Sequence, residues 1–386
     1  MQSLKKEIRI TINNLTVSYY DEGPDDAPVV IFIHGFPFNK SMWNKQVEAL
    51  KDDYRVIAYD VRGHGNSDTG NDDFTIDLFV SDLLRFMDEL GIVKTVLCGL
   101  SMGGYITLNA VEKHPWRFEA LILSDTNCIA DSPESKEKRI TVIENIRENG
   151  VEKYADDSIK NLFAPESFIA KKVEIAAARE MIVNTSKNSL YRTLLALSGR
   201  KETCTELSEI KVPVLIMVGE KDTITPPAAA RLMHEKIKGS ILHIIGQAGH
   251  LSNMENPLEF NGQLKKFLTS VYSKKIKPAG KMENHSKSET TFNPEPGKHQ
   301  PKPKGQNRGE TLSYEDADKD LNSKILKITM TIMDQYPELS KYIEEMPVTI
   351  PNEKNPDVTL SNLKTYYESL SLMLNKYKTE HPSIEN

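Results

Sequence analysis

One serine of the chain lies in a glycine-rich turn between a strand-like run and a helix-like stretch. Residues 99–104 read Gly-Leu-Ser-Met-Gly-Gly, after the apolar run 95–98 and before apolar residues at helical spacing over 105–111. A strand, a G-x-S-x-G turn and a helix in this order form a nucleophile elbow, which raises the serine hydroxyl at the carboxyl edge of a sheet. Gly99 and Gly103 suit a bend too sharp for flanking side chains. We therefore predict that Ser101 is a nucleophile.

The region 7–271 alternates between apolar runs of strand length and amphipathic stretches of helix length. An opening hairpin is predicted from the alternating residues 8–12 and the run 16–20, which flank the turn pair Asn13-Asn14. The remaining predicted strands are 29–33, 56–59, 95–98, 120–123, 214–218 and 241–245, and the helices lie near 41–50, 76–90, 102–113, 227–237 and 257–271. Continuous apolar strands separated by helices predict an α/β fold, with a mostly parallel sheet covered by helices on both faces.

Residues 132–206 interrupt this alternation. They contain several amphipathic helical stretches and no convincing strand. We interpret the segment as a helical cap over the edge of the sheet; the alternative is a set of ordinary crossover helices. The main domain is thus expected to span 1–272.

The composition changes after residue 272. Residues 273–312 are basic, rich in proline and glycine, and almost free of apolar side chains, which is typical of a disordered linker. Helical periodicity returns over 313–386, with Leu321, Ile325, Ile328 and Ile332 on one face and Leu363, Tyr367, Leu370, Leu374 and Tyr377 on another. A small all-α module with so thin a core could bind a protein partner or self-associate, or it could be a solvated appendage.

Charge and cysteine usage restrict the class of protein. The net charge of −6 gives no reason to expect a nucleic-acid partner. We expect no membrane association, because no stretch approaches the ~20 apolar residues of a membrane helix. The amino terminus has no apolar core of signal-peptide length. Cys98, Cys128 and Cys204 have no metal-ligand spacing, so we expect reduced, buried thiols in a cytoplasmic protein.

A serine nucleophile requires a base and an acid that holds the base. In this topology the order along the chain is serine, acid, histidine. His250 follows the last predicted strand, in Ala-Gly-His-Leu, and is the candidate base. Asp222 follows the preceding strand and is the candidate acid, with Glu220 and Asp125 as rivals.

Two backbone N–H groups are candidates to stabilise an oxyanion. Met102 follows the nucleophile and opens a helix, where backbone donors have no intrahelical acceptor. Phe36 lies in His-Gly-Phe-Pro, after the strand 29–33. His34 is expected to brace this loop. In the loop 60–68, Arg62 is expected to bind a carboxylate, since the spacing there matches no metal-ligand pattern.

The acyl pocket is predicted to be apolar, which favours a hydrophobic or small acyl group. The candidate lining residues are Phe36, Trp43, Leu100, Phe163, Leu194 and Leu195. The same side chains could instead belong to the core.

Five motifs in this order resemble the α/β-hydrolase superfamily. They are His34-Gly35-Phe36, the loop 60–67, the elbow 99–104, Gly-Glu-Lys-Asp at 219–222 and Gly249-His250. The elbow and the segment 213–222 look most similar to 3-oxoadipate enol-lactonases and related carboxylic-ester hydrolases. The resemblance implies an eight-stranded sheet, a Ser101–Asp222–His250 triad, an oxyanion hole at Phe36 and Met102, a helical cap, and no cofactor or metal.

We therefore expect hydrolysis of a small-molecule ester or lactone through an acyl-enzyme. Two other activities on the same machinery remain open, cofactor-free perhydrolysis (haloperoxidase activity) and thioester hydrolysis. A small-molecule receptor or signalling partner on the same fold is the non-enzymatic alternative.

Overall fold

The computed structural model describes residues 6–273 and, beyond them, Ile328, Ile332, Tyr336, Tyr367, Leu370, Ser371, Leu374 and Tyr377. The chain forms two compact units, Met1–Asn284 and His285–Asn386, and each is considered by itself. Among the described residues, no helix combines the length and apolar character needed to cross a bilayer.

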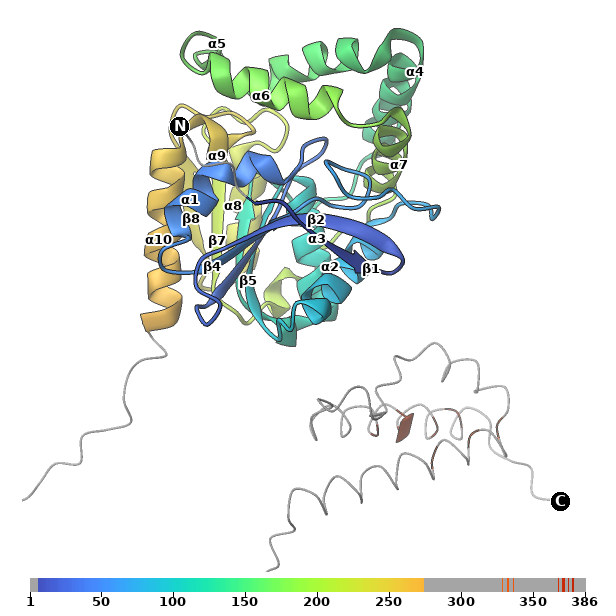
Figure 1. The fold of residues 1–386 in the computed structure, drawn as a ribbon, viewed down its shortest axis with the longest axis vertical. Helices are drawn as coiled ribbons and strands as arrows, with labels where there is room; N and C mark the ends of the chain where they lie inside the picture. Colours follow the sequence, from blue (N-terminus) through green and yellow to red (C-terminus); the bar gives the residue numbers. More distant parts are fainter. Residues whose placement is uncertain are drawn as a thin grey trace, which may run out of the picture. The chain divides into compact units, whose positions relative to one another are not determined.

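The first unit is built on an eight-stranded sheet (Figure 1). The strands are β1 (Ile8–Ile12), β2 (Leu15–Glu22), β3 (Val29–Ile33), β4 (Arg55–Tyr59), β5 (Thr95–Leu100), β6 (Phe118–Ser124), β7 (Val214–Gly219) and β8 (Ile241–Ile245). Their order is β1-β2-β4-β3-β5-β6-β7-β8, and every pair from β4 onward is parallel. The predicted mostly parallel sheet is confirmed.

The opening hairpin forms where the alternating pattern predicts it. Strands β1 and β2 pair antiparallel, with Ile12 opposite Leu15. The two turn residues between them, Asn13 and Asn14, have φ values of 48° and 59°. Asparagine tolerates this left-handed conformation, which a two-residue hairpin turn requires at both central positions. Strand β2 then pairs antiparallel with β4 and attaches the hairpin to the parallel strands.

Helices cover both faces of the sheet, because its central strands are apolar on both sides. One face packs on α1 (Asn44–Leu50), which follows the short helix η1 (Lys40–Trp43), and on α10 (Pro257–Ser273). The other face packs on α2 (Ile76–Glu89), α3 (Met102–Lys113) and α8 (Pro227–Lys236). A short turn, η2 (Pro115–Arg117), joins α3 to β6.

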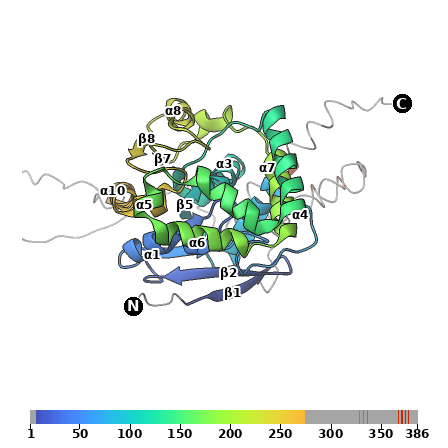
Figure 2. The ribbon, with the colours of Figure 1, turned by 90° about the horizontal axis from the view of Figure 1, so that it is seen from above.

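Four helices between β6 and β7 form the predicted cap (Figures 1 and 2). They are α4 (Pro133–Leu162), α5 (Ser167–Ala170), α6 (Lys172–Val183) and α7 (Lys187–Ser198), followed by η3 (Glu206–Glu209). The helix α4 changes direction at Gly150, whose φ of 88° is non-helical. Apolar side chains of α4, α6 and α7, including Ile146, Ile182 and Leu190, are buried in one cluster with the core.

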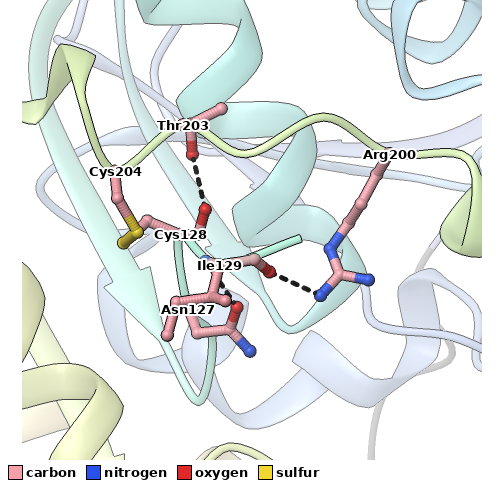
Figure 3. Close-up of a disulfide and its surroundings, with 6 residues drawn as sticks. All are labelled: Asn127, Cys128, Ile129, Arg200, Thr203 and Cys204. Atoms are coloured by element: carbon pink, nitrogen blue, oxygen red, sulfur yellow. Dashed lines mark hydrogen bonds between the residues drawn. A yellow bond between two sulfur atoms is a disulfide. The ribbon is translucent and has the colours of Figure 1, made fainter. Parts of the chain in front are cut away.

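A disulfide joins the two ends of this cap (Figure 3). Cys128, just after β6, is bonded to Cys204, just before η3, across a sequence separation of 76. The Thr203 N–H also donates to the Cys128 carbonyl oxygen at 2.9 Å. The prediction of reduced thiols is therefore wrong for these two cysteines, because the chain that leaves the cap passes directly beside the segment after β6. Cys98 is buried and free.

Eight positions of the second unit are described. Ile328 and Ile332 are helical, as are Tyr367, Leu370, Ser371, Leu374 and Tyr377. Ile332 and Leu370 are fully buried, and the rings of Tyr336 and Tyr377 pack edge to face with centroids 5.8 Å apart. A separate helical module over 313–386 stays a prediction. The predicted linker 273–312 lies outside the described residues except for Ser273.

Candidate active site

Ser101 occupies the sharp turn between β5 and α3. Its backbone has φ 53° and ψ −112°, a conformation that L-residues rarely adopt and that occurs at functional turns. The turn requires glycine on both sides: a Cβ on Gly99 would lie 2.1 Å from the Gly103 carbonyl oxygen, and one on Gly103 would lie 2.3 Å from the Ile33 carbonyl oxygen. The close approach of β3, β5 and α3 thus depends on the two glycines of the motif.

His250 and Asp222 meet Ser101 at this edge of the sheet. The Nε2 atom of His250 lies 3.0 Å from Ser101 Oγ, and its Nδ1 atom lies 2.9 Å from Asp222 Oδ2. Asp222 also accepts hydrogen bonds from the N–H groups of Ile224 and Thr225 and from the Thr225 hydroxyl. With the proton on Nδ1, the imidazole can accept the serine proton at Nε2. The arrangement therefore has the geometry of a base activating a nucleophile.

The two rival acids have other contacts. Glu220 is exposed and accepts a hydrogen bond from the Gln247 N–H at 3.3 Å. Asp125 is fully buried, where its carboxylate accepts the Gly219 N–H at 2.8 Å and the hydroxyls of Ser124 and Ser252. It thereby joins the segment before Asp222 to the segment after His250, and none of these three hydrogen bonds involves the imidazole.

Burial and neighbouring charges shift the pKa values of His250 and Asp222 in opposite directions. Burial disfavours the imidazolium of His250, but the carboxylates of Asp222, Asp125 and Glu255 together outweigh it and raise the pKa of His250 above 6.5. Burial also opposes ionisation of Asp222, yet the facing imidazole and Thr225 hold the pKa of Asp222 below its ordinary value. Burial raises the pKa of Asp125 to about 7. The surroundings thus favour an ionised Asp222 and a more basic His250.

The candidate oxyanion donors lie on two loops beside Ser101. Met102 is the first residue of α3, so its N–H has no acceptor within the helix. Phe36 follows β3 and precedes a cis peptide bond to Pro37, and within the described part of the chain its N–H makes no hydrogen bond. Gly35 approaches the nucleophile closely, since a Cβ there would lie 3.3 Å from Ser101 Cβ.

His34 and Arg62 brace the loops around the site, as predicted. His34 is fully buried, and its Nε2 atom accepts the Val61 N–H at 2.9 Å, which joins the loop after β3 to the loop after β4. Burial lowers the pKa of His34 to about 4, so the ring is neutral near pH 7. Arg62 donates two hydrogen bonds of 2.7 Å to the buried carboxylate of Asp82. Such a forked pair fixes the orientation of the loop.

A cavity of about 1030 Å³ lies between this edge of the sheet and the cap, and both Ser101 and His250 line it. Of the predicted pocket residues, Phe36 and Leu194 line the cavity as well. Trp43, Leu100, Phe163 and Leu195 do not. Trp43 is buried in the core against Phe32 and Phe260, Leu100 and Phe163 are buried outside the lining, and Leu195 is 52% exposed on the other side of α7.

The cavity wall is more polar than the sequence predicted. The cap contributes Ser135, Lys138, Arg139 and Val142 from one side of α4, and Tyr154 and Ser158 from its second half. Asp131 lies among them and pairs with both Arg139 and Arg200. The spacing of residues 135, 138, 139 and 142 matches one face of a helix, a signal that could have identified them.

Comparison with known proteins identifies the family of the fold. Residues 28–257 match the model of the family described as alpha/beta hydrolase fold. The chain is 29% identical over 252 residues to 3-oxoadipate enol-lactonase 2 of Acinetobacter baylyi. The alignment covers 65% of this chain and 92% of that protein.

Two solved structures are similar as well. A thermophilic esterase from Thermogutta terrifontis aligns with a TM-score of 0.65 and 33% identity, covering 69% of this chain and 99% of that one. The enol-lactonase from Burkholderia xenovorans aligns with a TM-score of 0.64 and 30% identity, covering 68% and 100%. The chain therefore belongs to the α/β-hydrolase-fold family.

Proposed function

We propose that the protein is a serine hydrolase that cleaves a carboxylic ester or a lactone through an acyl-enzyme. The observation that carries the proposal is the hydrogen-bonded series Asp222–His250–Ser101, which ends at a cavity. The esterase and enol-lactonase relatives support the same class of reaction.

The proposed reaction begins with transfer of the Ser101 proton to His250 Nε2. The serine oxygen attacks the carbonyl carbon, and the negative charge formed on the carbonyl oxygen is stabilised by the N–H groups of Phe36 and Met102. Each donor of this kind is typically worth ~3 kcal/mol in the transition state. Asp222 holds the imidazole in one tautomer and stabilises the imidazolium.

His250 then gives the proton to the leaving alkoxide, and the acyl group remains on Ser101. For a lactone the leaving alcohol stays attached to the same acyl chain. Water, deprotonated by His250, attacks the acyl-enzyme and releases the acid, which regenerates the free serine. No step requires a metal or an organic cofactor.

The cavity suits an acyl group with both apolar and polar contacts. Part of the cavity wall is apolar and is formed by Leu162, Leu194 and Leu197. Another part is charged and is formed by Asp131, Lys138 and Arg139. The predicted wholly apolar pocket is thus incorrect. The mixed wall favours a substrate that carries polar groups away from the scissile carbonyl.

Substitution of the nucleophile tests the proposal. Ser101→Ala is expected to abolish turnover of p-nitrophenyl acetate and covalent labelling by a fluorophosphonate, while circular dichroism stays unchanged. Ser135→Ala is the matched control, because Ser135 also lines the cavity but lies on the cap. Equal turnover by Ser101→Ala and the wild type would refute the mechanism.

A panel of esters, lactones and thioesters, with peroxide and acetate added in one arm, separates hydrolysis from the related activities on this machinery. Tight binding of a small molecule without turnover or labelling would favour a receptor.

A further inference from the structure

A buried carboxylate outside the triad contacts both the cap and the loop that carries the histidine. Glu255 ends the short helix α9 (Ser252–Glu255) and is 1% exposed. Its Oε1 atom accepts the Gly249 N–H at 2.7 Å. Its Oε2 atom accepts the Ala164 N–H at 2.8 Å and the Ser167 hydroxyl at 2.5 Å. One side chain thus joins residues adjacent to His250 with residues between α4 and α5.

The backbones of these two segments also touch directly. The His250 N–H donates to the Leu162 carbonyl oxygen at 2.9 Å. A Cβ on Gly249 would lie 2.7 Å from the Ala164 nitrogen, so the approach requires glycine at this position. We call residues 246–251 the histidine loop and residues 161–167 the cap end. The donors of both segments thus converge on one carboxylate.

The cap end borders the space that a substrate occupies. Asn161 and Leu162 line the cavity together with Ser101 and His250. The Glu255 contacts therefore set the position of this wall relative to the nucleophile. A shift of about 1 Å in such a contact can cost roughly a hundredfold in rate when it displaces reacting groups.

Charge connects Glu255 to the histidine as well. Its carboxylate raises the pKa of His250, as do the carboxylates of Asp222 and Asp125. Asp222, in the loop after β7, contacts the imidazole directly, whereas Asp125 after β6 and Glu255 in α9 act on it through their charge alone. Burial raises the pKa of Glu255 itself, and the surrounding donors oppose that shift.

We propose that Glu255 is a positioning residue that couples docking of the cap to the orientation of His250, a role that rests on the proposed function. A merely structural glutamate would stabilise the fold without linking the two segments. The coupling instead predicts two measurable effects of changing Glu255. Amide exchange should become faster in the cap end and in the histidine loop together, and the acid limb of the pH–activity profile should shift when the Glu255 charge is removed.

Three variants of the full chain separate these roles. Glu255→Gln removes the negative charge. It also replaces one acceptor oxygen with an NH₂ group, which then faces the hydrogen-bond donors of either the cap end or the histidine loop. Ser167→Ala removes one cap contact and keeps the charge. Glu259→Gln is the matched control, because Glu259 accepts the Gly246 N–H at 3.1 Å and also bonds His243 and Asn256, which lie outside the cap.

Amide hydrogen exchange followed by mass spectrometry reads the coupling without any need for activity. In Glu255→Gln, peptides from both the cap end and the histidine loop are expected to exchange about tenfold faster, as expected for loss of one buried hydrogen bond to a charged group. In Glu259→Gln the cap end is expected to exchange as in the wild type. In Glu255→Gln, faster exchange in only one of the two segments would refute the coupling.

Kinetics supply the second readout. With Glu255→Gln, the acid limb of kcat/KM is expected to move to lower pH by about half a unit, since a negative charge near the imidazole is lost. KM is expected to rise more for p-nitrophenyl hexanoate than for the acetate, because the longer acyl group reaches the cap. Ser167→Ala should show the KM effect without the pH shift. An unmoved acid limb in a folded Glu255→Gln would show that the proposal is wrong.

Two further outcomes are decided by the same data. If Glu255→Gln does not fold, exchange in Ser167→Ala decides: loosening of both segments supports the coupling, and loosening of the cap end alone refutes it. If the wild type neither turns over esters nor labels at Ser101, the proposed function fails, whereas the exchange result still judges the coupling of the two segments.

Discussion

His250 Nε2 lies 3.0 Å from Ser101 Oγ, although 149 residues separate them in the sequence. The contact arises because β5 and β8 belong to one parallel sheet, so the segments after their carboxyl ends meet at one edge. The cap and the sheet then enclose the pair beside a cavity. Proton transfer between the two atoms requires no rearrangement of the chain.

Asp222→Asn is expected to lower kcat by about a thousandfold or more and to change KM little. The amide cannot hold Nδ1 in its protonated form, so Nε2 no longer faces Ser101 as an acceptor. Steady-state kinetics with p-nitrophenyl acetate measure the loss. Glu220→Gln is the control, since the exposed Glu220 bonds the Gln247 N–H, and it should keep wild-type activity. A larger loss in Glu220→Gln would transfer the role of acid to that residue.

The acid limb of kcat/KM is expected to have its midpoint above 6.5, because the carboxylates around the imidazole, Asp222 foremost, together outweigh burial and raise the pKa of His250. Only the neutral imidazole can accept the serine proton, so activity falls as pH drops through this pKa. Rates of fluorophosphonate labelling should follow the same curve. A midpoint below 6.5 would contradict the assignment of His250 as the base in this environment.

The meeting of Ser101, Asp222 and His250 could be predicted because each of them follows the end of a strand. They come within five residues of the ends of β5, β7 and β8, and parallel strands place such positions on one edge of the sheet. The hairpin, the order of strands and helices, and the cap follow from the same periodicity. The braces of His34 and Arg62 could be predicted because glycine-rich loops at a sheet edge need side chains to fix them.

The pocket could not be predicted in the same way, because its lining depends on how side chains point between packed helices. Leu194 and Leu195 are neighbours on α7, yet the first lines the cavity and the second is 52% exposed. Trp43 and Phe36 are both apolar, but Trp43 packs into the core. The disulfide between Cys128 and Cys204 depends on the return of the chain from the cap to the segment after β6, an approach that no local pattern shows.

A buried histidine is expected to make stability depend on pH. Burial lowers the pKa of His64 to about 3, whereas an unfolded chain has the ordinary value of 6.5. Between these values the unfolded state binds a proton that the folded state does not, so this group destabilises the fold increasingly as pH falls below 6.5. The linkage slope is about 1.4 kcal/mol per pH unit for one proton.

His64→Gln removes that proton. The stability of the variant relative to the wild type is therefore expected to rise by about 1.4 kcal/mol per pH unit as pH falls from about 5.5 to 4.5. Urea denaturation at several pH values measures the difference, and other titrating groups cancel between the two proteins. A pH-independent difference would show that His64 is not buried neutral in solution.

The disulfide is expected to stabilise the first unit by roughly 4 kcal/mol, because closing a loop of this length removes conformational entropy from the unfolded chain. The bond closes a separation of 76 residues that contains the whole cap. Cys204→Ser should lower the melting temperature by several degrees, since 1 kcal/mol shifts Tm by roughly 2–4 °C in a domain of this size. Dithiothreitol should lower the Tm of the wild type and leave that of Cys204→Ser unchanged.

Because Asn127, Ile129 and Arg200 beside the bond line the cavity, the rate of ester hydrolysis should fall under the same reducing conditions. An equal effect of dithiothreitol on both proteins would assign it to something other than this bond.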